Sequence, residues 1–281
     1  MEAQDKVFWH GAFFEALQLE FHQYLNALDF EDEHQLSKEA LIMDVLIIKK
    51  KPGERIDKNI GRIFKTYNVF EFKSEKDSLT EQDYNKVVAY ALLYSSFTCA
   101  PVSDITVSFA VTIHPRELFK YLEKERGFAI QVVEDGIYYI EGDTFPVQIM
   151  ESKRMSPEEN IFIRNLRSNL QVEDAAKTAE AYKKIKPYEM KNVYLDRLIQ
   201  ANHNAFMEVV ALGDGFKNLI LEISEQDWFR EAYEQYVKRR EAEEAEQQLM
   251  GVAKKLLKMG INVEQVTEAT ELPYETVVSL V

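Results

Sequence analysis

Cysteine, histidine and long apolar runs are all scarce in this 281-residue sequence. It has a single cysteine, Cys99, and five histidines that lack the spacing of metal ligands and are expected to be surface or core residues. Disulfide frameworks and zinc sites of paired cysteines are therefore excluded, and a reducing cytoplasm is the expected setting. No run is apolar for the length that a membrane span needs, and the first residues lack the pattern of a signal peptide. We therefore expect a cytoplasmic protein without a membrane partner.

Positive charge is scarce too, because 34 lysine and arginine residues stand against 48 aspartate and glutamate residues, a formal net charge of -14. Such a balance argues against binding of nucleic acid by bulk electrostatics. The exception is a basic connector from residue 49 to residue 65, with seven basic and two acidic residues. Lys49 and Arg62 could grip a phosphate backbone there. The alternative is a solvated hairpin that turns at Pro52 and Gly53.

Three polar residues interrupt apolar, strand-like sequence on either side of the basic connector. Asp44 lies within the run LIMDVLII, which is typical of a strand buried on both faces. In the second run, VFEFK from residue 69 to residue 73, alternation puts Glu71 and Lys73 on one face and the phenylalanines on the other. If the two strands are neighbours, one surface of the sheet gathers two carboxylates and one ammonium.

This combination of side chains points to a particular chemistry. Converging carboxylates repel each other, which favours a hard divalent cation such as magnesium held through oxygen ligands. The ion can lower the pKa of a bound water and offset charge that develops on a phosphate, while a nearby lysine orients the water or steadies the anion. The pattern therefore predicts phosphodiester hydrolysis, with Asp44, Glu71 and Lys73 as candidate catalytic residues.

The Glu-x-Lys part of the pattern occurs three times in the chain. A copy at residues 151–153 follows a plausible strand, but no acidic residue lies inside an apolar run before it. Another copy, at residues 189–191, lies in a polar segment without strand character. The copy at Glu71 and Lys73 is therefore favoured. Its structural alternative is an ordinary ion pair near a strand end, and local sequence alone gives the two interpretations similar weight.

A wider set of segments resembles a known family. The segments are LIMDVLIIKK, GRIF, NVFEFKS, DSL at residues 77–79 and KVVAYALLY at residues 86–94, and they lie in about the first half of the chain. Together they resemble bacterial members of the PD-(D/E)XK nuclease superfamily, closest to proteins described as recombination-promoting nuclease or putative transposase. Met43 precedes Asp44 where the superfamily's name has a proline, which is a common departure.

The resemblance implies a restriction-endonuclease-like fold and an endonuclease that cleaves DNA with Mg2+ or Mn2+. It also implies that Asp44, Glu71 and the backbone carbonyl of Phe72 bind the metal and that Lys73 positions the attacking water. Members often place a carboxylate of the first helix near the metal, and Glu20 fits that accessory catalytic and metal-binding role. The alternative for Glu20 is a helix-edge residue that reaches solvent or pairs with a lysine.

Helical periodicity places several candidate residues on two predicted helices. Residues 6–28 have an apolar face at about 100° per residue, and Glu20 projects within that face. A serine or threonine near residue 80 can cap a further helix that runs to residue 94. On that helix Lys86 and Tyr90 are four residues apart and could both reach a phosphate. A solvent-facing pair is the alternative.

The whole pattern predicts an α/β fold, a mixed sheet flanked by helices with an all-α C-terminal extension. Further strands are expected at residues 33–39, 105–113, 128–133, 137–140 and 145–150, and further helices at 115–122, 158–170, 172–185, 193–212 and 224–259. We therefore expect a nuclease-like domain at 1–155, a helical extension at 156–260 and a C-terminal helical hairpin at 261–281.

The C-terminal hairpin looks like the helix-turn-helix tail of some relatives, but Glu271 stands where a turn glycine is usual. Residues 261–281 carry four glutamates and no lysine or arginine, whereas a helix that reads a DNA groove needs basic support. We therefore interpret the hairpin as a packing or oligomerisation element. The helical C-terminal half could then hold a homo-oligomer together.

Two functions of different classes are consistent with the sequence. The leading hypothesis is a magnesium-dependent DNA endonuclease built on Asp44, Glu71 and Lys73. The alternative is a catalytically idle relative that acts as an interaction or regulatory protein through its acidic helical half. Magnesium binding that depends on Asp44 distinguishes the two.

Overall fold

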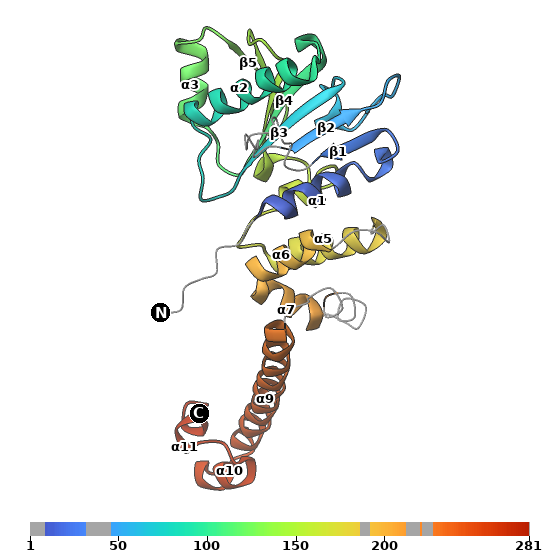
Figure 1. Cartoon of the computed structure of the whole chain (residues 1–281). Helices are drawn as coiled ribbons and strands as arrows, with labels where there is room; N and C mark the ends of the chain where they lie inside the picture. Colours follow the sequence, from blue (N-terminus) through green and yellow to red (C-terminus); the bar gives the residue numbers. More distant parts are fainter. Residues whose placement is uncertain (1–8, 32–45, 186–191, 212–219, 221–226, 281) are drawn as a thin grey trace. The chain divides into compact units, whose positions relative to one another are not determined.

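The computed structural model describes residues 9–31, 46–185, 192–211, 220 and 227–280 (Figure 1). Asp44 and the strand expected at residues 33–39 lie outside these ranges. The chain divides into two compact units, Met1–Ile223 and Ser224–Val281. The boundary expected near residue 156 lies inside the first unit, because helices that follow it pack against the N-terminal helix.

A mixed sheet forms the centre of the first unit. In the described part of the chain its strands are β1 (Leu28–Glu31), β2 (Leu46–Lys50), β3 (Tyr67–Lys73), β4 (Ile105–Val111), β5 (Ala129–Glu134), β6 (Ile137–Glu141) and β7 (Val147–Glu151), in the spatial order β1-β2-β3-β4-β7-β6-β5. The pairs β3–β4 and β4–β7 are parallel, and the other neighbours are antiparallel. The predicted α/β class with a mixed sheet is therefore confirmed.

Helices precede, interrupt and follow the strands. The first unit contains α1 (His10–Glu20), α2 (Glu81–Thr98), α3 (Arg116–Lys124), α4 (Ile161–Arg164), α5 (Val172–Ile185), α6 (Val193–Ala201) and α7 (His203–Ala211). The helix predicted over 6–28 ends at Glu20, because the chain turns there and enters β1. The helix predicted over 193–212 is two helices, interrupted at Asn202.

Asn202 breaks the helix because its side chain serves a neighbouring segment. Its amide donates to Arg167 O at 2.9 Å, and its carbonyl oxygen accepts from Leu170 N at 2.9 Å. The segment around residues 167–170 is therefore a held loop rather than the second half of the helix predicted over 158–170. Only α4 is helical in that stretch.

The two faces of the sheet are covered differently. Val69, Phe109 and Ile149 belong to one buried cluster with side chains of α2 and α3, so these two helices cover that face. On the opposite face Phe13 of α1 stacks on Phe72, with ring centroids 4.9 Å apart. Because strand side chains alternate, Glu71 and Lys73 point toward the α2 and α3 side and Phe72 points toward α1.

The start of α2 follows the predicted capping pattern. Thr80 is the N-cap, and its hydroxyl accepts from Asp83 N while the Asp83 carboxylate accepts from Thr80 N, a complete capping box. The helix ends at Thr98, and its C-cap, Cys99, adopts a left-handed conformation with φ 57°. These local contacts fix the point where α2 leaves the sheet edge, and they hold Asp83 beside β3.

The second unit is helical. It contains α9 (Asp227–Lys258), α10 (Val263–Thr270) and α11 (Tyr274–Val278), and a small core of Ala253, Val266, Leu272 and Val277 joins them. Glu271 between α10 and α11 has φ 56°, so the turn has the left-handed conformation that glycine usually supplies. Across the described residues of both units, no helix has the length and apolar character required to cross a membrane.

Candidate functional site

Three neighbouring strands end at the same edge of the sheet. β3, β4 and β7 are parallel, and Val111 of β4 is paired with Lys73 on one side and with Glu151 on the other. Paired residues point to the same face, so the side chains of Lys73 and Glu151 share the face covered by α2 and α3. Their backbones are two strand spacings apart, roughly 10 Å. Two groups of charged residues lie at this edge, one around Lys73 and one around Glu151.

The first group, the Lys73 cluster, consists of Glu71, Lys73 and Asp83. Lys73 Nζ lies 2.8 Å from Asp83 Oδ1 and 3.3 Å from Glu71 Oε1. The three side chains are between 13% and 26% exposed, so solvent reaches them but does not surround them. β3 supplies two of the residues and the first turn of α2 supplies the third. The cluster therefore joins a strand end to a helix start.

The charges of the Lys73 cluster are fixed by mutual contact. Partial burial by itself lowers the pKa of Lys73. The hydrogen bond to Asp83 and the charges of Asp83 and Glu71 together raise it by more, so the net shift of the pKa is upward. Burial raises the pKa of Asp83, but hydrogen bonds from Lys73 and Thr80 lower it more, and the net shift is downward. At neutral pH Lys73 is therefore an ammonium ion, suited to hold an anion or orient a water molecule rather than to abstract a proton.

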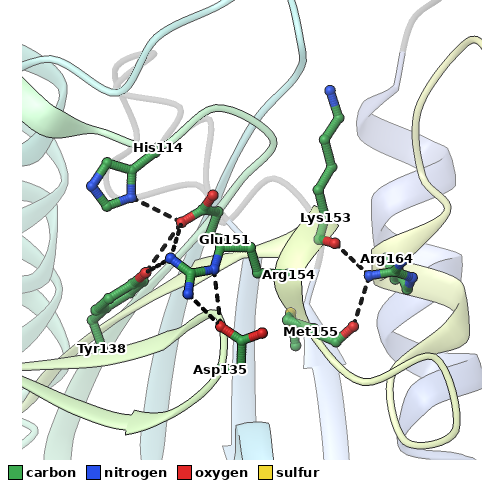
Figure 2. A network of polar contacts seen from close by, with 8 residues as sticks. All are labelled: His114, Asp135, Tyr138, Glu151, Lys153, Arg154, Met155 and Arg164. Carbon is green, nitrogen blue, oxygen red and sulfur yellow. Dashed lines mark hydrogen bonds and ion pairs between the residues drawn. The ribbon is translucent and has the colours of Figure 1, made fainter.

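The second group, the Glu151 cluster, surrounds the end of β7 (Figure 2). Glu151 Oε2 lies 2.8 Å from His114 Nδ1 and accepts from the Tyr138 hydroxyl at 3.2 Å. Arg154 donates to the same hydroxyl at 3.2 Å and pairs with Asp135 at 2.6 Å. Burial raises the pKa of Tyr138, and the charge of Glu151 raises it further. Tyr138 is therefore a neutral donor that holds one Glu151 oxygen.

The Glu151 cluster leaves one part of His114 open. With a proton on Nδ1, His114 donates to Glu151, and its imidazole Nε2 then carries a free lone pair. The His114 side chain is 40% exposed, whereas that of Glu151 is 11% exposed. A buried carboxylate that orients an exposed imidazole is an arrangement used to hold a histidine in one tautomer for proton transfer or ligand binding.

A turn between β5 and β6 supports the Glu151 backbone. Glu151 N donates to Gly136 O at 2.7 Å. Gly136 has φ +79°, and a Cβ at this position would lie 2.8 Å from Glu151 O and 2.9 Å from Met155 N. Only glycine therefore allows the turn to approach the end of β7 this closely.

A pocket with a volume of about 420 Å3 lies between the starts of α2 and α3. Residues 78–82 form one wall, and His114 with the first residues of α3 forms another. Thr80 on the first wall is hydrogen-bonded to Asp83 of the Lys73 cluster, and His114 on the second is bonded to Glu151. The pocket is therefore linked by direct contacts to both charged groups.

The predicted catalytic residues do not all fall within this site. Glu71 and Lys73 lie together in it, and Asp44 lies outside the described residues. Glu20 lies on α1, the helix that covers the opposite face of the sheet. Its Oε1 accepts from Phe162 N at 2.8 Å and from Ile163 N at 3.0 Å, and its Oε2 pairs with Lys58 at 2.8 Å. Glu20 thus caps the start of α4 and lies on the side of the sheet opposite Glu71 and Lys73.

Burial has the largest single effect on the pKa of Glu20. The side chain is 2% exposed, and burial raises its pKa, while Lys58 and the backbone N–H groups of α4 lower it; the net shift is upward. A second buried carboxylate of α1, Glu15, accepts a hydrogen bond from the backbone N–H of Tyr194 on α6. Both carboxylates of α1 therefore attach it to the helices that follow the sheet.

The predicted phosphate-binding residues are dispersed. Lys49 pairs with Glu31 near the start of β3, and Arg62 pairs with Glu134. Lys86 lies over the ring of Tyr90 at 5.4 Å on the exposed side of α2. Six of the seven basic residues of the connector contact partners within the chain, namely Lys49, Lys50, Lys51, Arg55, Lys58 and Arg62. Of these contacts, the pair of Lys58 with Glu20 is largely buried, whereas those of Lys50, Lys51 and Arg55 are exposed.

The described residues do not by themselves complete a metal site. Among them, no group of three or more histidine, cysteine, aspartate or glutamate side chains is arranged to hold an ion. Glu71 and Asp83 offer the oxygen ligands that magnesium prefers, but the Lys73 ammonium lies between them. Asp44, the other carboxylate that the sequence predicts for this site, lies outside the described ranges.

Asp83, His114 and Glu151 were not among the predicted site residues. Asp83 was recognisable as a capping residue, but its contact with Lys73 depends on where α2 leaves the sheet. Glu151 belongs to the Glu-x-Lys copy at residues 151–153, which the sequence does not favour, and Figure 2 shows that Lys153 of this copy extends away from the cluster. The pairing of His114 with Glu151 has no signal in local sequence, because 37 positions separate them. Comparisons of the chain with protein-family models, curated proteins and solved structures gave no match.

Proposed function

We propose that this protein is a metal-dependent endonuclease that hydrolyses phosphodiester bonds in DNA, on a restriction-endonuclease-like core. The supporting observation is that Glu71 and Lys73 lie 3.3 Å apart on one face of β3, at the carboxyl edge of parallel strands. Both side chains are partly exposed, and a pocket of about 420 Å3 adjoins the helix start that holds Asp83. This is where a phosphate group could meet an acidic residue and a fixed ammonium.

Each residue of the proposed site has a separate role. The Lys73 ammonium steadies the non-bridging oxygen of a phosphate or orients the attacking water. Asp83 keeps Lys73 protonated and limits its rotation. Asp44 and Glu71, with the carbonyl of Phe72, bind Mg2+ or Mn2+. When bound, the ion lowers the pKa of water and offsets charge on the phosphate.

The role proposed for Asp44 depends on the register of the chain before β2. Leu46 pairs with Phe70 in an antiparallel register. An unbroken register would set Val45 rather than Asp44 beside Glu71, because successive side chains alternate between faces. Asp44 can serve the site only if the chain leaves this register before Leu46, for example through a bulge.

Cleavage of DNA by purified variants tests the proposal. Supercoiled plasmid and a single-stranded oligonucleotide are incubated with the protein and Mg2+, with EDTA as the metal-free control. We expect nicking that needs the metal and that falls at least 100-fold in Asp44→Ala, in Glu71→Gln and in Lys73→Ala. Lys153→Ala is the matched control, because it changes the lysine of another Glu-x-Lys copy, and its cleavage should equal that of the wild type.

Melting temperature separates a chemical loss from an unfolded variant. A Lys73→Ala protein that melts near the wild-type temperature and does not cleave supports the assignment. Cleavage that persists equally in Asp44→Ala and Lys73→Ala would show that the nuclease activity, if present, is located elsewhere.

One specific observation favours the second function, an idle interaction or regulatory protein. The Lys73 ammonium contacts both described carboxylates of the site, and most of the basic connector is engaged within the chain. Calorimetric titration with Mg2+ distinguishes the two functions. A nuclease site gives heat that disappears in Asp44→Ala, whereas an idle relative gives the same trace for both proteins.

A further inference from the structure

An apolar stripe runs along α9 beside the face that the C-terminal hairpin covers. Three large hydrophobic side chains of the stripe are exposed: Leu249 and Val252 of α9 at 40% and 47%, and Met259, the residue that follows the helix, at 75%. Leu256 completes a row at spacings of three and four residues; it is half-buried because one side of it packs against the core that joins α9 to the hairpin. Ala242 and Ala245 extend the row toward the N-terminus. At about 100° per residue these six positions fall within an arc of roughly 100°. The stripe therefore forms one narrow seam of the kind found in paired helices.

The charges on α9 are divided along its length. Residues 241–248 carry four glutamates and no basic residue, whereas residues 249–258 carry three lysines and no acidic residue. In the described structure all of these charged side chains are exposed. The helix therefore has an acidic half and a basic half, and the seam crosses both.

We propose that the seam binds a second copy of this chain, with the two α9 helices antiparallel. In that orientation the acidic half of one helix lies beside the basic half of the other. A parallel pair would bring acidic half against acidic half and would set Glu241 against Glu246 of the partner, a repulsive contact between flanking positions. Charge complementarity thus selects both the occupant and its direction.

The sizes of the seam residues fit the same arrangement. A two-fold axis between residues 250 and 251 sets Leu249 against the partner's Val252. It also sets Ala245 against the partner's Leu256 and Ala242 against the partner's Met259, so that every small residue meets a large one. Large residues facing small ones let two helices approach closely without voids. The parallel alternative sets alanine against alanine at two layers and leaves space there.

The seam spans about 26 Å, from residue 242 to residue 259 at 1.5 Å per residue. A seam of this length is short for a coiled coil, so we expect a dimer that dissociates on dilution. This inference does not depend on the proposed nuclease activity, because none of its residues lies in the first unit.

Sedimentation equilibrium of the full chain over a range of concentrations tests the dimer. We expect the wild type to shift from monomer toward twice the chain mass of 32.8 kDa as concentration rises. Val252→Glu puts a charge at the centre of the seam and should remain monomeric. Gln247→Glu is the matched control, because it adds the same charge on the opposite side of α9, and it should dimerise as the wild type does. Circular dichroism checks that both variants keep their helix content.

Disulfide trapping tests the direction in a Cys99→Ser background. A mixture of Ala242→Cys and Met259→Cys proteins should form a cross-linked pair on oxidation, whereas Ala242→Cys alone should not, because its two copies are about 26 Å apart in the antiparallel pair. Cross-linking of Ala242→Cys with itself would overturn the antiparallel arrangement. A wild type that stays monomeric at every concentration, or a Val252→Glu protein that still dimerises, would overturn the seam itself.

Discussion

Lys58 of the basic connector and Glu20 of α1 form an ion pair in which Nζ and Oε2 are 2.8 Å apart and the side chains are only 14% and 2% exposed. The other Glu20 oxygen accepts from two backbone N–H groups at the start of α4. One carboxylate therefore joins the connector, the first helix and the helix that follows the sheet. Sequence alone left two roles open for Glu20, a metal ligand or the partner of a lysine, and the structure shows the pair with Lys58.

Glu20→Ala should destabilise the protein by about 3 kcal/mol, because it leaves two buried backbone N–H donors without an acceptor and removes the charge that pairs with the half-buried Lys58 ammonium. Glu20→Gln should cost less, since its amide oxygen can still accept from α4. Chemical denaturation measures the unfolding free energy of both variants. If Glu20 instead served as a metal ligand, the two variants would unfold like the wild type and would differ from it only in magnesium binding.

The charge of Glu20 also makes a pH-dependent contribution. Its pKa in the folded protein is raised above the ordinary value of 4.5. The folded state therefore takes up a proton at higher pH than the unfolded state, so the fold gains stability as pH falls through the raised pKa toward 4.5. In the same denaturation series, the unfolding free energy of the wild type should rise relative to that of Glu20→Gln as pH falls through that window. A difference that stays constant would contradict the raised pKa.

Asp83→Asn should lower stability by about 1 kcal/mol at neutral pH, because it removes the charge that pairs with Lys73 but keeps an oxygen to cap α2. The folded pKa of Asp83 is depressed below the ordinary value of 3.8. Its stabilising contribution is therefore fully present above pH 3.8 and is lost as pH falls through the depressed pKa. The wild-type advantage over the variant should shrink in that acidic window.

Asp77→Asn serves as the control for the Asp83 measurement. Asp77 contacts the Ser74 hydroxyl at 3.1 Å, and asparagine can keep that contact. Its unfolding free energy should follow that of the wild type across the pH range. An equal effect of the two substitutions would mean that the contact with Lys73 contributes nothing specific.

Gly136→Ala should destabilise the protein by about 2 to 4 kcal/mol. The left-handed backbone costs an alanine about 1 kcal/mol, and contact of the new Cβ with backbone atoms near Glu151 and Met155 adds about 1 to 3 kcal/mol of overpacking. Gly53→Ala is the matched control, because Gly53 has φ +81° and nothing lies within 4 Å of the added Cβ. Gly53→Ala should lose only the stability that the left-handed backbone costs an alanine. Thermal unfolding of the two variants compares their losses.

Much of the first unit was predictable from local sequence. The alternation at residues 69–73 predicted that Glu71 and Lys73 share a face, and the register of β3 confirms it. The capping pattern predicted the start of α2 because both partners of the capping box lie within one turn. Such features depend on residues a few positions apart, where backbone geometry alone sets which side chains meet.

Other features depended on tertiary structure. The contact between Lys73 and Asp83, the pairing of His114 with Glu151 and the capping of α4 by Glu20 each join residues of different elements. The sequence context of Glu20 fits a carboxylate that faces a metal or a lysine, and its contacts with Lys58 and α4 arise only when the elements pack. Periodicity determines which face of an element a residue occupies, whereas the burial and charge of its neighbours, which set the chemistry of a carboxylate, are determined only when the elements pack.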